Sequence, residues 1–134
     1  MLFKFLGKYR DLGLLILRLG VGGCFIAHGL PKLGDSKSWA GLGKPMKYLG
    51  IDFFPEFWGF MAAVTEGIGG VLLILGVFYR PVCLLLMFTM IVATLSHAVP
   101  EKRDFNKYSN PLKLAFVFLG LATVGPGRFS IDKD

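Results

Sequence analysis

The chain has 134 residues, of which 54% are hydrophobic and only 18% are charged. A soluble domain carries about 25% charged residues and a disordered chain has low hydrophobicity, so the composition argues against both classes. The net charge is +6. Because most basic residues lie between apolar blocks, we expect them to contact anionic lipid headgroups and not nucleic acid. The length predicts a single domain, residues 1–134.

Four apolar blocks follow one another along the chain. They span about residues 12–30, 57–79, 82–99 and 112–124. Crossing a bilayer takes roughly 20 apolar residues in a helix, and the first three blocks are long enough. The fourth is shorter, but Pro111 fits the first turn of a helix and Gly125-Pro126-Gly127 ends it, so a short span is expected. The pattern therefore predicts an all-α fold, a four-helix transmembrane bundle that is multi-pass in the cell membrane.

The connections between the blocks differ in length. Residues 31–56 combine proline, glycine, lysine and aromatic side chains, which is typical of an interfacial segment, and a short amphipathic helix is expected around residues 40–49. Arg80-Pro81 makes a short link, so the second and third helices should form an antiparallel hairpin. Four crossings place both termini on one side, and the basic residues near the N-terminus favour the cytoplasm.

Four ionisable residues lie inside the apolar blocks. With about 1.5 Å of rise per residue, His28 and His97 lie at about 24 Å from the terminal side, Glu66 at about 20 Å and Arg18 at about 9 Å. Intramembrane ionisable residues usually face the bundle interior. We therefore predict that His28, Glu66 and His97 line one cavity reached from the side of the long loop. Arg18 should form its floor, Trp58 a wall and residues 31–56 its lid.

Each of these residues also has a purely structural interpretation. Arg18 can snorkel to the nearer surface or pair with Glu66, and each histidine can be an interfacial hydrogen-bonding group. Cys24 and Cys83 are expected to be packing residues, and with no CxxC pair they form neither a disulfide scaffold nor a thioredoxin-type motif.

Small residues mark the helix contacts expected between the first two blocks. The first block carries a stripe of Gly20, Gly23 and Ala27, and the second carries Gly67 and Gly70. Small residues let helix backbones approach closely in a membrane. These two helices are therefore predicted to pack against each other.

Several short motifs occur in a fixed order along the chain. They are Leu17-Arg18-Leu19-Gly20, His28-Gly29-Leu30-Pro31-Lys32, Glu66-Gly67-Ile68-Gly69-Gly70, Arg80-Pro81, His97 and Gly125-Pro126-Gly127-Arg128-Phe129-Ser130-Ile131-Asp132. Their order and spacing resemble the DoxX family of small four-helix bacterial and archaeal membrane proteins over nearly the whole chain. The resemblance implies an inner-membrane location with cytoplasmic termini. It also implies a link to membrane redox chemistry, as in the thiosulfate:quinone oxidoreductase subunit of that name, or to oxidative-stress complexes.

Three functions remain open from the sequence. The first is a membrane oxidoreductase subunit that handles quinone with a redox partner protein, in which His28, Glu66 and His97 supply hydrogen bonds and protons. The side chains expected to contact the bound molecule are Arg18, Lys32 and Trp58.

The other two functions need no quinone. Two histidines and a carboxylate can hold a metal or a haem, although the HxxxH and CxxCH spacings are absent. The third possibility is a membrane scaffold, assembly factor or small-solute carrier, including a homo-oligomeric one. In it, His28, Glu66 and His97 would hold helices together or line the pathway of a solute.

Overall fold

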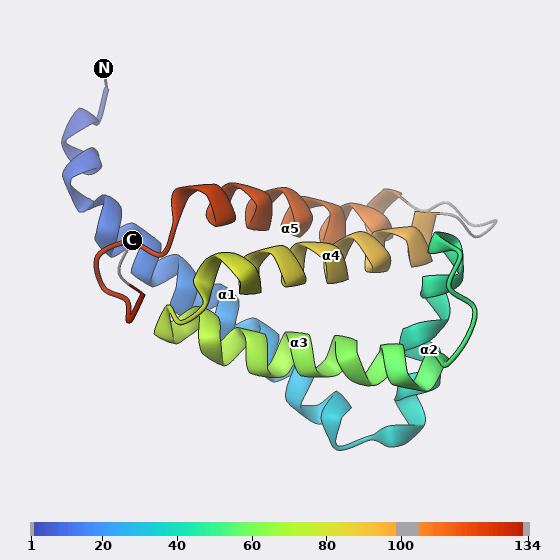
Figure 1. The fold of residues 1–134 in the computed structure, drawn as a ribbon. Helices are drawn as coiled ribbons and strands as arrows, with labels where there is room; N and C mark the ends of the chain where they lie inside the picture. The colour runs from blue at the N-terminus through green and yellow to red at the C-terminus, as the bar shows by residue number, and fades with distance from the viewer. Residues whose placement is uncertain (1, 99–104, 133–134) are drawn as a thin grey trace.

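The computed structural model describes residues 2–98 and 105–132, and all regular secondary structure within these ranges is helical (Figure 1). The α-helices are α1 (Arg10–Leu33), α2 (Trp39–Gly43), α3 (Pro55–Leu75), α4 (Tyr79–Ala98) and α5 (Phe105–Val124). Short 3₁₀ helices span Lys4–Tyr9, Ser36–Ser38 and Lys44–Leu49. The prediction of an all-α bundle with a long loop after its first helix is confirmed.

The four predicted blocks become α1, α3, α4 and α5, with shifted ends. α1 continues through Pro31 to Leu33, and α5 begins at Phe105, well before Pro111, because polar residues there extend the helix beyond the apolar block. α3 ends at Leu75, since Gly76 adopts a left-handed conformation with φ 70°. The hairpin turn is therefore residues 76–78, and the predicted Arg80-Pro81 link lies in the first turn of α4 instead.

Two helical stretches are long and apolar enough to cross a membrane. They are residues Lys4–Leu33, which include α1, and Pro55–Leu75, which is α3. Shorter apolar helices cover Tyr79–Leu95 in α4 and Ser109–Val124 in α5. Large apolar side chains are exposed on all four long helices, including Ile16, Ile68, Leu84 and Phe116, as expected where helices contact lipid.

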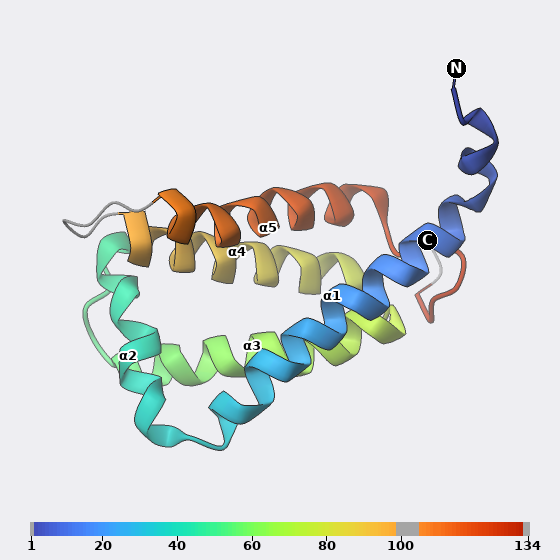
Figure 2. The same cartoon turned by 180° about the vertical axis from the view of Figure 1, so that it is seen from behind.

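The helices pack as two pairs, α1 with α3 and α4 with α5 (Figure 2). The pairs meet in a core that includes Leu73, Tyr79 and Leu86. The rings of Phe25 on α1 and Phe118 on α5 lie 5.4 Å apart, centroid to centroid. Both termini lie at one end of the bundle and α2 lies at the other (Figure 1).

Glycines set the close approach of α1 to α3. A Cβ at Gly22 would lie 2.7 Å from the Gly70 carbonyl oxygen, and a Cβ at Gly29 would overlap the backbone of Gly67. The predicted packing of these helices through Gly67 and Gly70 is therefore correct. The predicted stripe on α1 is wrong, because Gly20 and Gly23 have open space around them and Ala27 is exposed. The buried face of α1 is instead Arg18, Gly22, Phe25 and Gly29, which follows helical spacing.

Arg18 joins three segments at the terminal end of the bundle. Its Nε donates to the Leu73 carbonyl at 3.0 Å and its Nη2 to the Ile74 carbonyl at 2.6 Å. Its Nη1 donates to the carbonyls of Pro126 at 3.2 Å and Phe129 at 2.7 Å. The last carbonyls of a helix have no partner within it and carry partial negative charge. Arg18, only 1% exposed, satisfies two of those of α3.

The C-terminal segment closes the turn between α3 and α4. The Asp132 carboxylate accepts the backbone N–H groups of Phe78 at 3.2 Å and Tyr79 at 2.8 Å, at the start of α4. The Asp132 N–H donates to the Gly76 carbonyl at 2.9 Å, and the Ile131 N–H donates to the Leu75 carbonyl at 3.2 Å. The motif that follows α5 is thus a clasp on the neighbouring hairpin.

Candidate ligand-binding cavity

The segment between α1 and α3 is held tightly against α3. A Cβ at Gly43 would overlap the Pro55 carbonyl, and a Cβ at Gly59 would overlap the Trp39 carbonyl. The Trp39 indole N–H donates to the Lys32 carbonyl at 2.8 Å, which ties the segment to the end of α1. These contacts fix residues 39–49, which we call the lid, over one end of the bundle.

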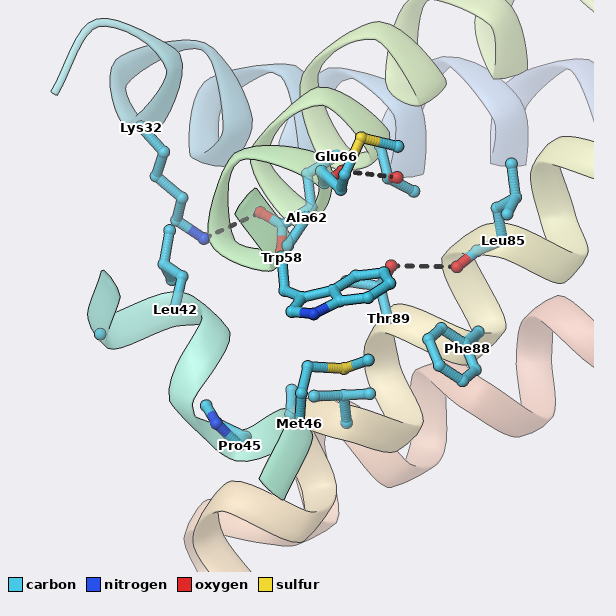
Figure 3. A pocket seen from close by; sticks show the side chains of 15 residues that line it. Lys32, Leu42, Pro45, Met46, Trp58, Ala62, Glu66, Leu85, Phe88 and Thr89 are labelled. Atoms are coloured by element: carbon cyan, nitrogen blue, oxygen red, sulfur yellow. Dashed lines mark hydrogen bonds and ion pairs between the residues drawn. The ribbon is translucent and has the colours of Figure 1, made fainter. Parts of the chain in front are cut away.

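A cavity of about 450 Å³ lies between the lid, α3 and α4 (Figure 3). This volume is within the usual range of about 300–1,000 Å³ for small-molecule sites. α3 contributes residues 58, 61, 62, 65 and 66, and α4 contributes residues 85, 88, 89, 92 and 93. Each set follows the helical spacing of one face. Leu42, Pro45 and Met46 of the lid complete the wall, which confirms that the long loop covers this region.

An ion pair forms the polar part of this wall. Lys32 Nζ donates to Glu66 Oε2 at 2.8 Å, and the two side chains are 32% and 11% exposed. Lys32 lies in the last turn of α1, where the helix dipole favours a cation. Because an unpaired carboxylate is costly to bury, the lysine keeps Glu66 compatible with its position in the middle of α3.

The remaining described lining side chains carry no charge. The hydroxyl groups of Thr65 and Thr89 donate to carbonyls of their own helices, those of Met61 and Leu85, at 2.8 and 3.0 Å. Their donor hydrogens are therefore already used within the protein. Among the described residues of the wall, only Lys32 and Glu66 are charged, so they are the natural partners of a polar group inside the cavity.

The structure brings together three of the six predicted site residues. Glu66, Lys32 and Trp58 line the same cavity. His28 is exposed on α1 and is not among the lining residues. His97 belongs to the last turn of α4, and its side chain lies outside the described residues. The catalytic roles predicted for the two histidines stay predictions.

Arg18 occupies a different place from the one expected. It neither pairs with Glu66 nor lines the cavity, because its guanidinium is bound by carbonyls at the opposite end of α3. The partner of Glu66 is Lys32, a residue 34 positions away that sequence reasoning did not pair with it. A signal was available, since Lys32 lies one helical turn beyond His28 and a long side chain can reach back toward the depth estimated for Glu66.

A metal-binding arrangement was a further possibility. Among the side chains that the structure describes, those of residues 2–95 and 109–132, no group of three or more His, Cys, Asp or Glu is placed to hold a metal ion.

Comparison with known proteins adds a family context. Residues 13–98 match the family described as DoxX. The inner membrane protein YphA of Escherichia coli K12 is 32% identical over 95% of this chain and 93% of its own length. The inner membrane protein YqjF of the same strain is 30% identical over 94% of both chains. A Bacillus subtilis 168 protein named "Putative oxidoreductase CatD" is 32% identical over 68% of this chain and 63% of its own length. No solved structure matches the chain.

Proposed function

This chain belongs to the DoxX family of membrane proteins, and on that premise we propose that it is the quinone-binding subunit of a membrane oxidoreductase. The observation that carries the proposal is the Lys32–Glu66 ion pair on the wall of a cavity whose other described lining residues are uncharged. A relative carries oxidoreductase in its name, which supports a redox role. The relatives named as inner membrane proteins support a location in that membrane. We further propose four crossings, with cytoplasmic termini as the basic residues near the N-terminus favour.

A quinone headgroup suits the chemistry of this wall. Its ring is apolar and flat, and Trp58, Met46 and Leu42 offer apolar surface for it. Its two carbonyl oxygens need hydrogen-bond donors, and the Lys32 ammonium carries three N–H donors, of which Glu66 uses one. We propose that Lys32 donates to one quinone oxygen.

Reduction of a quinone to a quinol takes up two electrons and two protons. In the proposed role, a partner redox protein supplies both electrons. Glu66, next to Lys32, relays protons to the quinone oxygens. A carboxyl group is suited to this role because it can act as a general acid and base toward an oxygen that gains negative charge during reduction. His28 and His97 lie on helices that flank this region, and either could extend the proton path.

Tryptophan fluorescence offers a direct test of quinone binding. The chain has two tryptophans, and only Trp58 lines the cavity. We expect a short-chain benzoquinone to quench the fluorescence of the purified protein saturably, and Trp58→Phe to abolish the saturable part. Lys32→Leu should weaken binding about tenfold or more, since a hydrogen bond to a charged donor contributes about 1.5–3 kcal/mol.

Lys113→Leu is the matched control, because Lys113 is an exposed lysine of α5 outside the cavity. It should bind the quinone as the wild type does. Quenching that never saturates, or equal affinity for the wild type and Lys32→Leu, would show that the cavity does not bind quinone through Lys32.

A further inference from the structure

The cavity has a polar side and an apolar side. In Figure 3, Lys32 and Leu42 lie on one side, Leu85 and Phe88 of α4 lie on the other, and Trp58 lies between them. Lys32 therefore lies on the other side of Trp58 from Leu85 and Phe88. A ligand that fills the cavity must present a polar group toward Lys32 and an apolar part toward α4.

The apolar side of the cavity is partly open to the surroundings of the bundle. Leu85 is 56% exposed, Phe88 45% and Met61 of α3 41%, although all three line the cavity. These residues belong to the apolar faces of α3 and α4. In a membrane protein such faces contact lipid. The boundary between α3 and α4 at Met61, Leu85 and Phe88, which we call the α3–α4 seam, therefore connects the cavity to the hydrocarbon region of the bilayer.

We infer that the ligand enters the cavity sideways from the bilayer through the α3–α4 seam and leaves its hydrocarbon chain over Leu85 and Phe88. This inference rests on the proposed quinone-binding function and adds the class of ligand: a membrane-dissolved amphiphile with one small polar head and one long apolar chain. The chain stays in an apolar environment throughout, so binding requires only the head to leave the lipid. The lid closes the other approach, since it is fixed to α3 through Gly43 and Gly59.

The test compares two ligands that share a headgroup. One is a methoxylated benzoquinone with a decyl chain and the other is the same ring without the chain, each titrated calorimetrically into the detergent-solubilised protein. Leu85→Trp fills the mouth of the seam. We expect it to weaken binding of the decyl quinone about tenfold and binding of the chainless ring by less, because only the decyl quinone places a chain over Leu85.

Leu84→Trp is the matched control, because Leu84 is the adjacent exposed leucine of α4 and lies outside the cavity wall. It should leave both affinities unchanged. Met61→Trp and its control Ile68→Trp repeat the comparison from α3, in case Leu85→Trp does not fold.

Two results would overturn the inference, and they are distinguishable. If Leu85→Trp and Met61→Trp bind the decyl quinone as tightly as their controls do, the bound chain does not lie in the seam and the inference is wrong, although the cavity still binds quinone. If the wild-type protein binds neither ligand, the proposed function itself fails and the inference fails with it.

Discussion

Two cations inside the bundle are stabilised in different ways, and the difference follows from their neighbours. Lys32 meets a carboxylate, so it forms one ion pair at the edge of a cavity. The planar guanidinium of Arg18 donates from its three nitrogen atoms to four backbone carbonyls. A lysine ammonium lacks that fixed fork of donors. Arg18 therefore ties the end of α3 to the C-terminal segment, and Lys32 lies on the wall of the cavity.

This contrast predicts how substitutions of Arg18 act. Arg18→Leu should lower the free energy of unfolding by about 3–5 kcal/mol, because several buried carbonyls lose a charged donor at once. Arg18→Lys should cost less but still destabilise, since one ammonium cannot reach all four oxygens. Thermal unfolding in detergent measures both. Arg128→Leu is the control, as its side chain is exposed on the same C-terminal segment. Equal unfolding temperatures for Arg18→Leu and Arg128→Leu would show that the hydrogen bonds of Arg18 do not stabilise the fold.

At the scale of the elements, the first helix decides where the site forms. The proline at position 31 suggests that the first helix ends at Leu30, yet α1 continues to Leu33. The added turn carries Lys32 to the level of Glu66, and the Trp39 indole then binds the Lys32 carbonyl at 2.8 Å. The Lys32 carbonyl is one of the last carbonyls of α1, which have no partner within the helix. The lid therefore satisfies the end of the helix after it has passed Pro31.

The contact between α1 and α3 predicts a large difference between two glycines of the same helix. Gly29→Val should destabilise the protein by about 1–3 kcal/mol or more, because the new side chain meets the α3 backbone where neither helix can move aside. Gly23→Val should be nearly neutral, since nothing lies near its Cβ position. Unfolding temperatures of the two variants in one detergent provide the comparison. A larger loss for Gly23→Val would mean that the opposite face of α1 is the packed one.

At the scale of the whole molecule, the sequence was informative about the fold and much less so about the site. The helices are predictable because a chain in lipid must satisfy its backbone internally, so apolar blocks mark them directly. Which face of a helix is buried depends on its neighbour, and the stripe of Gly20, Gly23 and Ala27 was for that reason assigned to the wrong face. The Lys32–Glu66 pair depends on the extension of α1 past Pro31, which the apolar pattern does not encode.

The last prediction concerns how the bundle sits in the membrane. The termini and the lid lie at opposite ends of the bundle (Figure 1), so a reagent confined to one side should reach only one of them. The basic residues Lys4, Lys8 and Arg10 favour the cytoplasm for the terminal end. In a Cys24→Ser background, Ser36→Cys should react with an impermeant maleimide in intact cells, because Ser36 is exposed beside the lid. Lys4→Cys should react only after the cells are permeabilised, and the background protein, whose Cys83 is buried, should stay unlabelled. The reverse labelling pattern would place the lid and the cavity beneath it on the cytoplasmic side. Labelling of both positions in intact cells would show that the two ends of the bundle do not lie on opposite sides of the membrane.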